Sequence, residues 1–288
     1  MENICGLMKG IMRRLRLLFF YCFKKEVRMR VTSQGILRAV FAPCCENIAP
    51  RYSAVVREDS KYIYYTITGE RDIFSYPREL PYHNFAQVIS EGCQKDHFHY
   101  YELPQTKIEY NDVVADCGSA EGFFAYKYRR NCQHIYCIEP LPVFCRALHK
   151  LFDTYNNVTI VEAALSDNNG RLYLSPSSTS STCKSEITDL NNDIPVEAVT
   201  MDSLFADKGV VVNFIKGDLE GFEEKMIIGS LKTIKMFKPK IALTTYHPGT
   251  NYKKIVDVIR HVVPEYQYLL KGVEESAGNP VMLHMWVE

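Results

Sequence analysis

After Tyr110 the chain alternates short apolar runs with segments whose apolar residues recur at helical spacing. This alternation is typical of strands and helices that take turns around a parallel sheet. The expected strands are Val113–Asp116, Ile135–Glu139, Val158–Glu162, Val210–Lys216, Ile241–Tyr246, Tyr266–Leu270 and Val281–Val287. The expected helices lie near Phe123–Arg130, Val143–Phe152, Phe222–Lys235 and Tyr252–Val262.

The last two of these strands are expected to pair as a hairpin. Only Lys271–Pro280 joins them, and this segment has no room for the crossover helix that parallel neighbours need. We therefore expect an α/β domain over residues 96–288 with a Rossmann-like, seven-stranded and mostly parallel sheet whose last strand is antiparallel. A sheet that binds an ordinary dinucleotide does not require such a hairpin.

Residues 1–95 are expected to form a small N-terminal α+β extension. Its first half shows little periodicity. Aromatic and β-branched residues then predict a hairpin over residues 54–68, with strands Ala54–Arg57 and Tyr62–Thr68. A helix is expected over residues 78–90.

One insertion interrupts the strand–helix alternation. Arg171–Leu174 and Val196–Val199 are expected strands, and Ser175–Glu186 between them is rich in Ser and Thr. This composition favours a mobile loop over a core element. The loop is either a lid over a substrate or a long solvated connection.

A basic, apolar segment spans residues 11–30. Its apolar stretch Leu15–Phe23 is interrupted by Arg16 and is far shorter than the roughly 20 residues that a membrane span needs. Flanking Arg and Lys residues are compatible with a helix that lies on an anionic membrane surface. The alternative is a helix that packs on its own domain.

Composition excludes some function classes. Lys plus Arg and Asp plus Glu number 34 each, so no overall field attracts nucleic acid, and no nucleic-acid partner is expected. The 10 cysteines include no CxxC pair, which favours reduced thiols and a cytoplasmic protein. This cytoplasmic protein could associate with a membrane through residues 11–30.

The strongest motif is the turn after the first strand of the expected sheet. Asp116 ends this strand, and Gly118, Ser119 and Gly122 follow. Gly118 can adopt a backbone conformation closed to other residues and lets a ligand approach. Backbone N–H groups at the start of the next helix can receive a cofactor carboxylate, and Asp116 can accept from a cofactor ammonium group. The spacing differs from the full GxGxxG of dinucleotide sites.

Two further strand ends complete the expected cofactor site. Glu139, followed by Pro140, stands 23 residues after Asp116, and an acid at this strand tip can bind both ribose hydroxyls. Ala163 and Ala164 follow the third strand, where small side chains leave a slot for adenine.

A third cluster of polar residues follows the fourth and fifth strands. Asp218, Glu220 and Glu223 lie at the expected ligand edge of the sheet, and His247 lies just past the neighbouring strand tip. A neutral imidazole near pH 7 makes His247 the first candidate for a general base. Asp218 is expected near the cofactor or the substrate. Glu220 and Glu223 could orient His247 or bind the acceptor, and Glu223 could equally be an acid at the start of a helix. Two carboxylates and a His can also ligate Mg²⁺ or Ca²⁺, but chemistry without a metal is favoured.

At these motifs the sequence resembles the FkbM family of S-adenosylmethionine-dependent methyltransferases. The matching segments, in the family's order, are VVADCGSAEG, YCIEP, EAALSDNNG, VTMDSL, FIKGDLEGFE and the Tyr246–His247 pair. The resemblance covers about residues 96–288. It implies S-adenosylmethionine as cofactor and methylation of a hydroxyl on a sugar, a glycan or a related natural product. Departures from the family pattern include Cys117, Ser119–Glu121 and Gly217.

Methyl transfer from a sulfonium needs a nucleophile about 3–3.5 Å from the methyl carbon and in line with the breaking bond. The leading hypothesis is therefore an O-methyltransferase with Asp116, Gly118, Glu139 and Asp218 around the cofactor. Two alternatives stay open. One is a catalytically silent module that acts in interactions or at a membrane, and the other is a methyltransferase that acts on protein.

Overall fold

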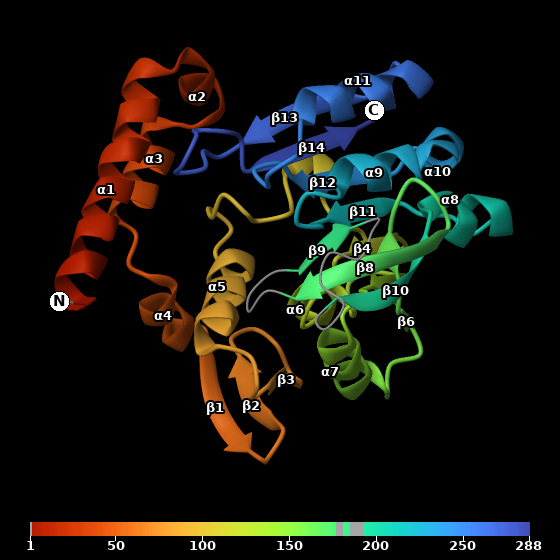
Figure 1. Cartoon of the computed structure of the whole chain (residues 1–288), viewed down its shortest axis with the longest axis horizontal. Helices are drawn as coiled ribbons and strands as arrows, with labels where there is room; N and C mark the ends of the chain where they lie inside the picture. The colour runs from red at the N-terminus through yellow and green to blue at the C-terminus, as the bar shows by residue number, and fades with distance from the viewer. Residues whose placement is uncertain (1, 177–180, 185–192) are drawn as a thin grey trace.

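The computed structural model describes residues 2–176, 181–184 and 193–288, and its centre is a seven-stranded sheet (Figure 1). The strand order is β13–β14–β12–β11–β4–β5–β6. All neighbours are parallel except β14, which is antiparallel to both β12 and β13. The bounds are β4 Val113–Cys117, β5 His134–Ile138, β6 Val158–Val161, β11 Phe214–Gly217, β12 Lys240–Thr244, β13 Gln267–Lys271 and β14 Met282–Trp286. The expected Rossmann-like class I methyltransferase fold, with its antiparallel last strand, is confirmed.

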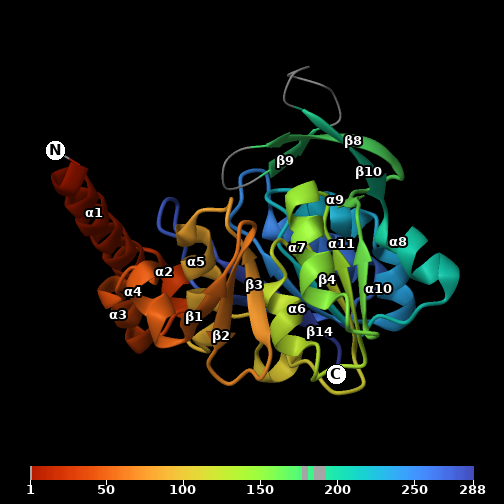
Figure 2. The ribbon, with the colours of Figure 1, turned by 90° about the horizontal axis from the view of Figure 1, so that it is seen from below.

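Helices cover both faces of this sheet, and two hydrophobic cores result (Figure 2). Val114 of β4 belongs to one core and its neighbour Ala115 to the other, and both are fully buried. A strand buried on both faces reads as a continuous apolar run, which is why these strands could be recognised in the sequence. The helices of the domain are α6 Phe123–Tyr128, α7 Pro142–Phe152, α8 Met201–Leu204, α9 Glu223–Ile228, α10 Leu231–Phe237 and α11 Tyr252–Val262, with 3-10 turns η2 Pro104–Thr106 and η3 Ala206–Lys208.

The single helix expected over Phe222–Lys235 is wrong, because the segment forms two helices that meet at Gly229. A Cβ at Gly229 would lie 2.1 Å from the backbone oxygen of Ser166. The chain therefore passes close to another backbone at this point, and α9 ends there.

The N-terminal extension is more helical than its sequence pattern indicates. The structure has α1 Glu2–Phe23, α2 Lys25–Arg30, α3 Ser33–Phe41, α4 Cys45–Ile48 and η1 Ala49–Arg51. Helices α1, α2 and α3 pack around a small core whose buried side chains are Leu17, Phe20, Val27, Val31, Ile36, Val40 and, from the segment after β13, Val273. By contrast, Cys45 of α4 and Ala49 of η1 pack in the core that is shared with the main sheet. Short helices such as α3 and α4 leave no long periodic run in the sequence, which explains why they were not expected. A helix was expected within residues 11–30, and α1 and α2 occupy this segment.

The expected hairpin is confirmed, and a third strand joins it. The antiparallel strands are β1 Ser53–Glu58, β2 Tyr62–Ile67 and β3 Ile73–Pro77. The helix expected over residues 78–90 begins later, as α5 Tyr82–Cys93, because Pro81 is its N-cap with extended backbone. Side chains of β3 and α5 share a core with the main sheet, so the extension packs against the larger domain.

The inserted segment forms a second, four-stranded sheet in the order β7–β10–β8–β9. The bounds are β7 Ala164–Leu165, β8 Gly170–Pro176, β9 Ser181–Lys184 and β10 Ile194–Val199. The expectation of a mobile loop over Ser175–Glu186 is therefore wrong for residues 181–184, which pair with β8. Residues 177–180 and 185–186 of that loop lie outside the described residues.

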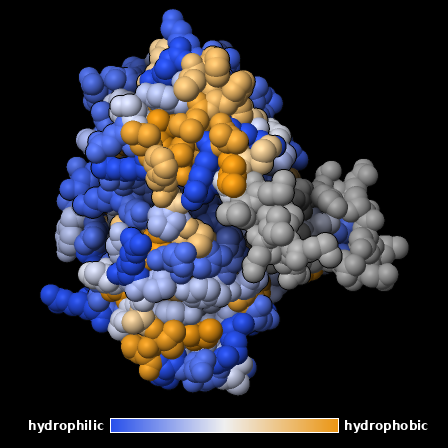
Figure 3. Space-filling view, turned by 90° about the vertical axis from the view of Figure 1, so that its left-hand side faces the viewer, coloured by the Kyte–Doolittle hydropathy of each residue, from blue (hydrophilic) through white to orange (hydrophobic). Residues whose placement is uncertain are grey.

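Helix α1 has one buried and one exposed apolar face. Leu17 and Phe20 are buried, whereas Leu15, Phe19 and Phe23 are exposed to 56%, 55% and 73%. Figure 3 views this side of the molecule and shows apolar patches beside hydrophilic ones. The buried face confirms that the helix packs on its own domain, whereas contact of the exposed face with a membrane stays a prediction. Within the described part of the chain, no helix is long and apolar enough to cross a membrane.

Candidate active site

The turn after β4 has the close approach that its glycine predicts. Gly118 has a positive φ of 73°, and a Cβ there would lie 2.0 Å from the backbone oxygen of Asp218. Its N–H donates to the carbonyl oxygen of Ile138, at the end of β5, over 2.9 Å. The turn is therefore held between the tips of β5 and β11, and only glycine fits.

A cavity of about 450 Å³ opens beside this turn. Most of the expected site residues line it, namely Gly118, Glu139, Pro140, Ala163, Ala164, Asp218, Glu220 and His247. The topology brings them together because the carboxyl ends of parallel strands meet at one edge of the sheet. Most of the expected cofactor residues and the three expected catalytic residues thus share one cavity.

Glu139 is a buried carboxylate on the wall of this cavity, exposed to only 5%. Its Oε2 accepts from the N–H of Ala120 and its Oε1 from the N–H of Leu141, each over 2.9 Å. Burial raises the pKa of Glu139 to about 7, although these two hydrogen bonds act in the opposite direction. Each oxygen keeps a lone pair for a further donor, as two neighbouring hydroxyls would supply.

Three expected cofactor residues, Asp116, Ser119 and Gly122, do not line this cavity. Asp116 is fully buried, and its carboxylate pairs with Lys216 Nζ over 3.1 Å, so it stabilises the strand ends from within. Gly122 packs on helix α7, where a Cβ would lie 2.7 Å from Leu148. Ser119 lines a neighbouring cavity of about 100 Å³, and its Oγ donates to the backbone oxygen of Asp116 over 2.8 Å. The expected roles of these three residues in cofactor binding stay predictions.

Lys216 is the buried cation that the sequence pattern did not reveal. Its Nζ also donates to the backbone oxygen of Gly118 over 2.5 Å. Burial lowers the pKa of Lys216, but the nearby carboxylates of Asp116 and Asp218 more than offset this, so its pKa lies above the ordinary value. Lys216 therefore stays charged and supports the glycine turn.

His247 stands among three carboxylates. Its Nδ1 lies 2.8 Å from Glu223 Oε1, and its Nε2 lies 3.6 Å from Asp218 Oδ1 and 3.7 Å from Glu220 Oε2. Burial lowers the pKa of His247, but the hydrogen bond to Glu223 and the charges of the three acids outweigh burial. The pKa of His247 is therefore raised, to about 9. The expectation of a neutral imidazole near pH 7 is therefore wrong for the free protein, whose ring carries a proton.

Asp218 connects this histidine to the rest of the cavity. Its Oδ2 accepts from the hydroxyl of Tyr101 over 2.8 Å, and its Oδ1 accepts from the hydroxyl of Thr244 over 3.1 Å. Burial raises the pKa of Asp218, but His247 and Lys216 outweigh this, and the pKa lies below its usual value. Asp218 is thus an ionised acceptor between Lys216 and His247.

Donor atoms of Asp218, Glu223 and His247 lie within 4.8 Å of one another, as a metal site requires. However, opposite nitrogens of the ring face different carboxylates, which is the arrangement of an ion-paired imidazolium. The expectation of chemistry without a metal stays a prediction.

Part of the cavity wall was not expected from the sequence. It comes from helix α5, which contributes His83, Asn84, Gln87, Val88 and Glu91, and from Glu121 and Tyr246. The helix α5 residues lie in a segment without a recognisable motif, so no sequence signal pointed to them. Only the packing of the extension on the main domain brings them to the site.

A profile of the FkbM methyltransferase domain matches residues 112–270, which is more than half of the chain. The chain belongs to the FkbM methyltransferase family. Within this FkbM domain lie the glycine turn, Glu139, Asp218 and His247, whereas α5 lies outside the matched region. The cavity is thus lined both by residues of the matched FkbM domain and by residues of α5 that the profile does not cover.

The chain is also similar to several solved structures. The FkbM methyltransferase of Methylobacillus flagellatus KT has 19% identity and a TM-score of 0.49, over 73% of this chain and 56% of that one. The present chain thus spans about half the length of that protein. Precorrin-6y C5,15-methyltransferase of Geobacter metallireducens GS-15 has 14% identity and a TM-score of 0.39, over 63% and 84% of the two chains. TYW2 of M. jannaschii, solved with AdoMet, has 13% identity and a TM-score of 0.41, over 81% and 87%. A comparison with curated proteins finds no match.

Proposed function

We propose that this FkbM-family protein transfers a methyl group from S-adenosylmethionine to a hydroxyl of a sugar, a glycan or a related natural product. The proposal rests on one observation: residues suited to cofactor binding and residues suited to catalysis line the same cavity. Gly118 and Glu139 suit the binding of a nucleoside cofactor, and Asp218 and His247 suit the handling of a hydroxyl proton.

The residues present fit the cofactor. Glu139 lines the cavity with two carboxylate oxygens that can accept from ribose hydroxyls, the small side chains of Ala163 and Ala164 leave space for a flat ring, and Gly118 provides a turn without a side chain. When bound, S-adenosylmethionine supplies an electrophilic methyl group on a positive sulfonium. A cavity that excludes water once the cofactor and the acceptor are bound would favour a reaction that consumes charge.

His247 is the proposed base for the acceptor hydroxyl. Glu223 holds its Nδ1, so Nε2 is the nitrogen that faces Asp218 and Glu220 at the cavity. With a pKa of about 9, roughly one ring in a hundred is neutral at about pH 7. The neutral form is correspondingly a stronger base, and the rate should rise with pH towards that pKa.

The acceptor is proposed to enter from a second cavity of about 880 Å³. Tyr246 and Gln87 line both cavities, so the two adjoin. Tyr246 and His99 offer ring faces, and Arg38, Gln94 and Asp96 offer polar groups, which together suit an acceptor with apolar faces and many hydroxyls. The size argues for an acceptor larger than a simple alcohol.

The test is incubation with S-adenosylmethionine labelled in its methyl group and a panel of nucleotide sugars, lipid-linked glycans and protein extracts. The expected product carries the label as a methyl ether on a carbohydrate oxygen, and His247→Gln should reduce its formation about 10²–10⁴-fold. His149→Gln is the matched control, because His149 is an exposed histidine paired with Glu162 on the surface. Label on protein instead of carbohydrate would overturn the acceptor class, and equal activity of His247→Gln would overturn the base.

A further inference from the structure

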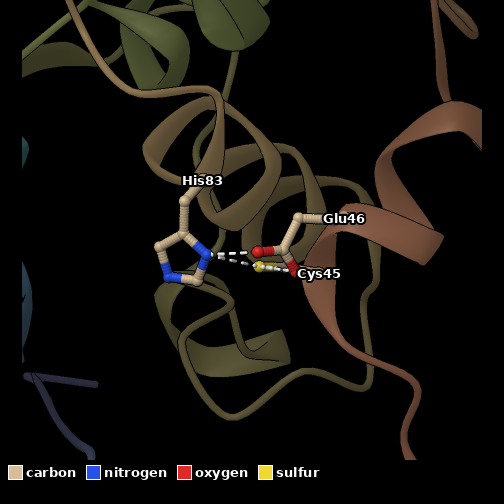
Figure 4. Close-up of side chains that lie close together, drawn as sticks. All are labelled: Cys45, Glu46 and His83. Carbon is tan, nitrogen blue, oxygen red and sulfur yellow. Dashed lines mark hydrogen bonds and ion pairs between the residues drawn. The ribbon is translucent and has the colours of Figure 1, made fainter. Parts of the chain in front are cut away.

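Three side chains of the N-terminal extension converge at one point (Figure 4). Cys45 and Glu46 come from α4, and His83 comes from the first turn of α5. Their donor atoms lie within 4.8 Å of one another. All three residues lie outside the matched family domain, and none has a role in the proposed methyl transfer.

The distances between these donors define a triangle. His83 Nδ1 lies 2.6 Å from Glu46 Oε1 and 3.7 Å from Cys45 Sγ, and Cys45 Sγ lies 3.3 Å from Glu46 Oε2. In a tetrahedral site with ligands about 2.0–2.3 Å from zinc, neighbouring donors lie about 3.4–3.6 Å apart. The two distances from Cys45 Sγ lie close to this range, although the sulfur and the imidazole nitrogen contact different oxygens of Glu46. The short contact between His83 Nδ1 and Glu46 Oε1 is a hydrogen bond that a metal would replace.

The same geometry argues against a catalytic cysteine. In a nucleophilic triad the histidine uses one ring nitrogen for the thiol and the other for the carboxylate. Here both the thiol and the carboxylate lie at Nδ1, so the three groups point at a common centre. Burial and the neighbouring Glu46 also raise the pKa of Cys45 to about 11, so the thiol is not activated on its own.

We propose that Cys45, Glu46 and His83 form a binding site for a divalent transition metal, with zinc as the best match to a thiolate, an imidazole and a carboxylate. Three protein ligands leave one tetrahedral position open. Binding replaces the thiol proton of Cys45, which leaves to solvent, and requires a neutral His83. His83 also lines the cavity that contains His247, so the site lies at the rim of the candidate active site. The proposal does not rest on methyl transfer.

The test uses the full chain, stripped with a chelator and titrated with Co²⁺. Cobalt bound to a thiolate gives a charge-transfer absorption band, which a site without cysteine cannot give. In the described part of the chain, the other groups with metal-site spacing are Glu91–His97–His99 and Asp218–Glu223–His247, and neither contains a cysteine. The expected result is a thiolate band that saturates at about one equivalent and disappears when Zn²⁺ is added.

Variants assign the band to the proposed residues. Cys45→Ser and His83→Gln should each abolish or greatly weaken it, whereas Cys22→Ser, which removes an exposed thiol of α1, should leave it unchanged. In the unaltered protein, Zn²⁺ should also protect Cys45 from alkylation, which tests the site without any variant. A missing thiolate band, a band that persists in Cys45→Ser, or alkylation of Cys45 unaffected by Zn²⁺ would each overturn the proposal.

Discussion

Glu223 Oε1 lies 2.8 Å from His247 Nδ1, and both side chains are buried. The same carboxylate accepts from the backbone N–H groups of Leu219 and Gly221, each over 3.0 Å, and from the hydroxyl of Thr250 over 2.6 Å. These bonds fix Glu223 at the start of α9, and Glu223 in turn fixes the histidine ring. The orientation of His247 is thus set by an acid that does not itself line the cavity.

Glu223→Gln removes a charge beside His247 with little change in shape. We expect the pKa of His247 to fall by about one unit or more, because the strongest interaction that raises it becomes neutral. The pH at which the methyl-transfer rate reaches half its maximum should fall by the same amount. The measurement is the pH dependence of kcat, together with an NMR titration of the ring.

Glu224→Gln is the matched control for this change. Glu224 is the next residue of α9, but its carboxylate pairs with Lys254 and accepts from the N–H of Asn251. It should leave the profile unchanged. An identical profile for the unaltered protein and Glu223→Gln would show that this contact does not control the protonation of His247.

Comparing Gly118→Ala with Gly209→Ala separates the close approach of the Asp218 backbone from the strain of a positive φ. Gly118 and Gly209 both have positive φ, of 73° and 67°, but a Cβ at Gly209 meets nothing within 4 Å. Gly209→Ala should therefore cost about 1–3 kcal/mol of stability through strain alone. Gly118→Ala should cost more and should also abolish cofactor binding, because its Cβ meets the backbone of Asp218. Urea unfolding and calorimetry measure the two effects, and equal losses in both variants would contradict the close approach.

The sequence predicted the sheet well because its central strands β4, β11 and β12 are almost entirely buried and appear as apolar runs, whereas the edge strand β13 is largely exposed. It also located Gly118, Glu139, Asp218 and His247, since residues that follow parallel strands meet at one edge. It did not distinguish Glu139, which lines the cavity, from Asp116, which lies behind it. That difference depends on Lys216, whose position in space is not visible in a linear pattern.

Two features of the site depend on long-range packing and could not be predicted from the sequence: the contribution of α5 to the cavity and the protonation of His247. Nothing in the local pattern of α5 indicates that His83 and Gln87 reach a cavity at the edge of a sheet that begins 20 or more residues later. The protonation of His247 was also misjudged, because three acids from separate turns surround it. The effect of these acids on the pKa of His247 cannot be predicted from the residues next to it in the chain, because the acids approach the ring only in the folded state.

The exposed apolar face of α1 predicts binding to anionic membranes. Leu15, Phe19 and Phe23 lie four residues apart on one face and are more than half exposed, with arginines nearby. Phe19→Ser with Phe23→Ser should weaken binding to phosphatidylserine vesicles about tenfold or more. The control is Val55→Ser with Val56→Ser, which removes exposed apolar side chains from β1. Equal vesicle binding by the unaltered protein and the α1 variant would exclude this role of α1.

Calorimetric titration with S-adenosylmethionine tests most directly whether the cavity that contains Glu139 binds this cofactor. We expect one molecule to bind, and Glu139→Gln should weaken binding about 10–100-fold through the loss of charge-assisted hydrogen bonds. Ribose hydroxyls favour the ionised carboxylate and lower its pKa from about 7, so the affinity of the unaltered protein should fall about tenfold per unit as the pH drops below about 7. Glu162→Gln, at an exposed acid near the next strand tip, should behave like the unaltered protein. Absence of binding, or binding that is indifferent to Glu139, would contradict the account.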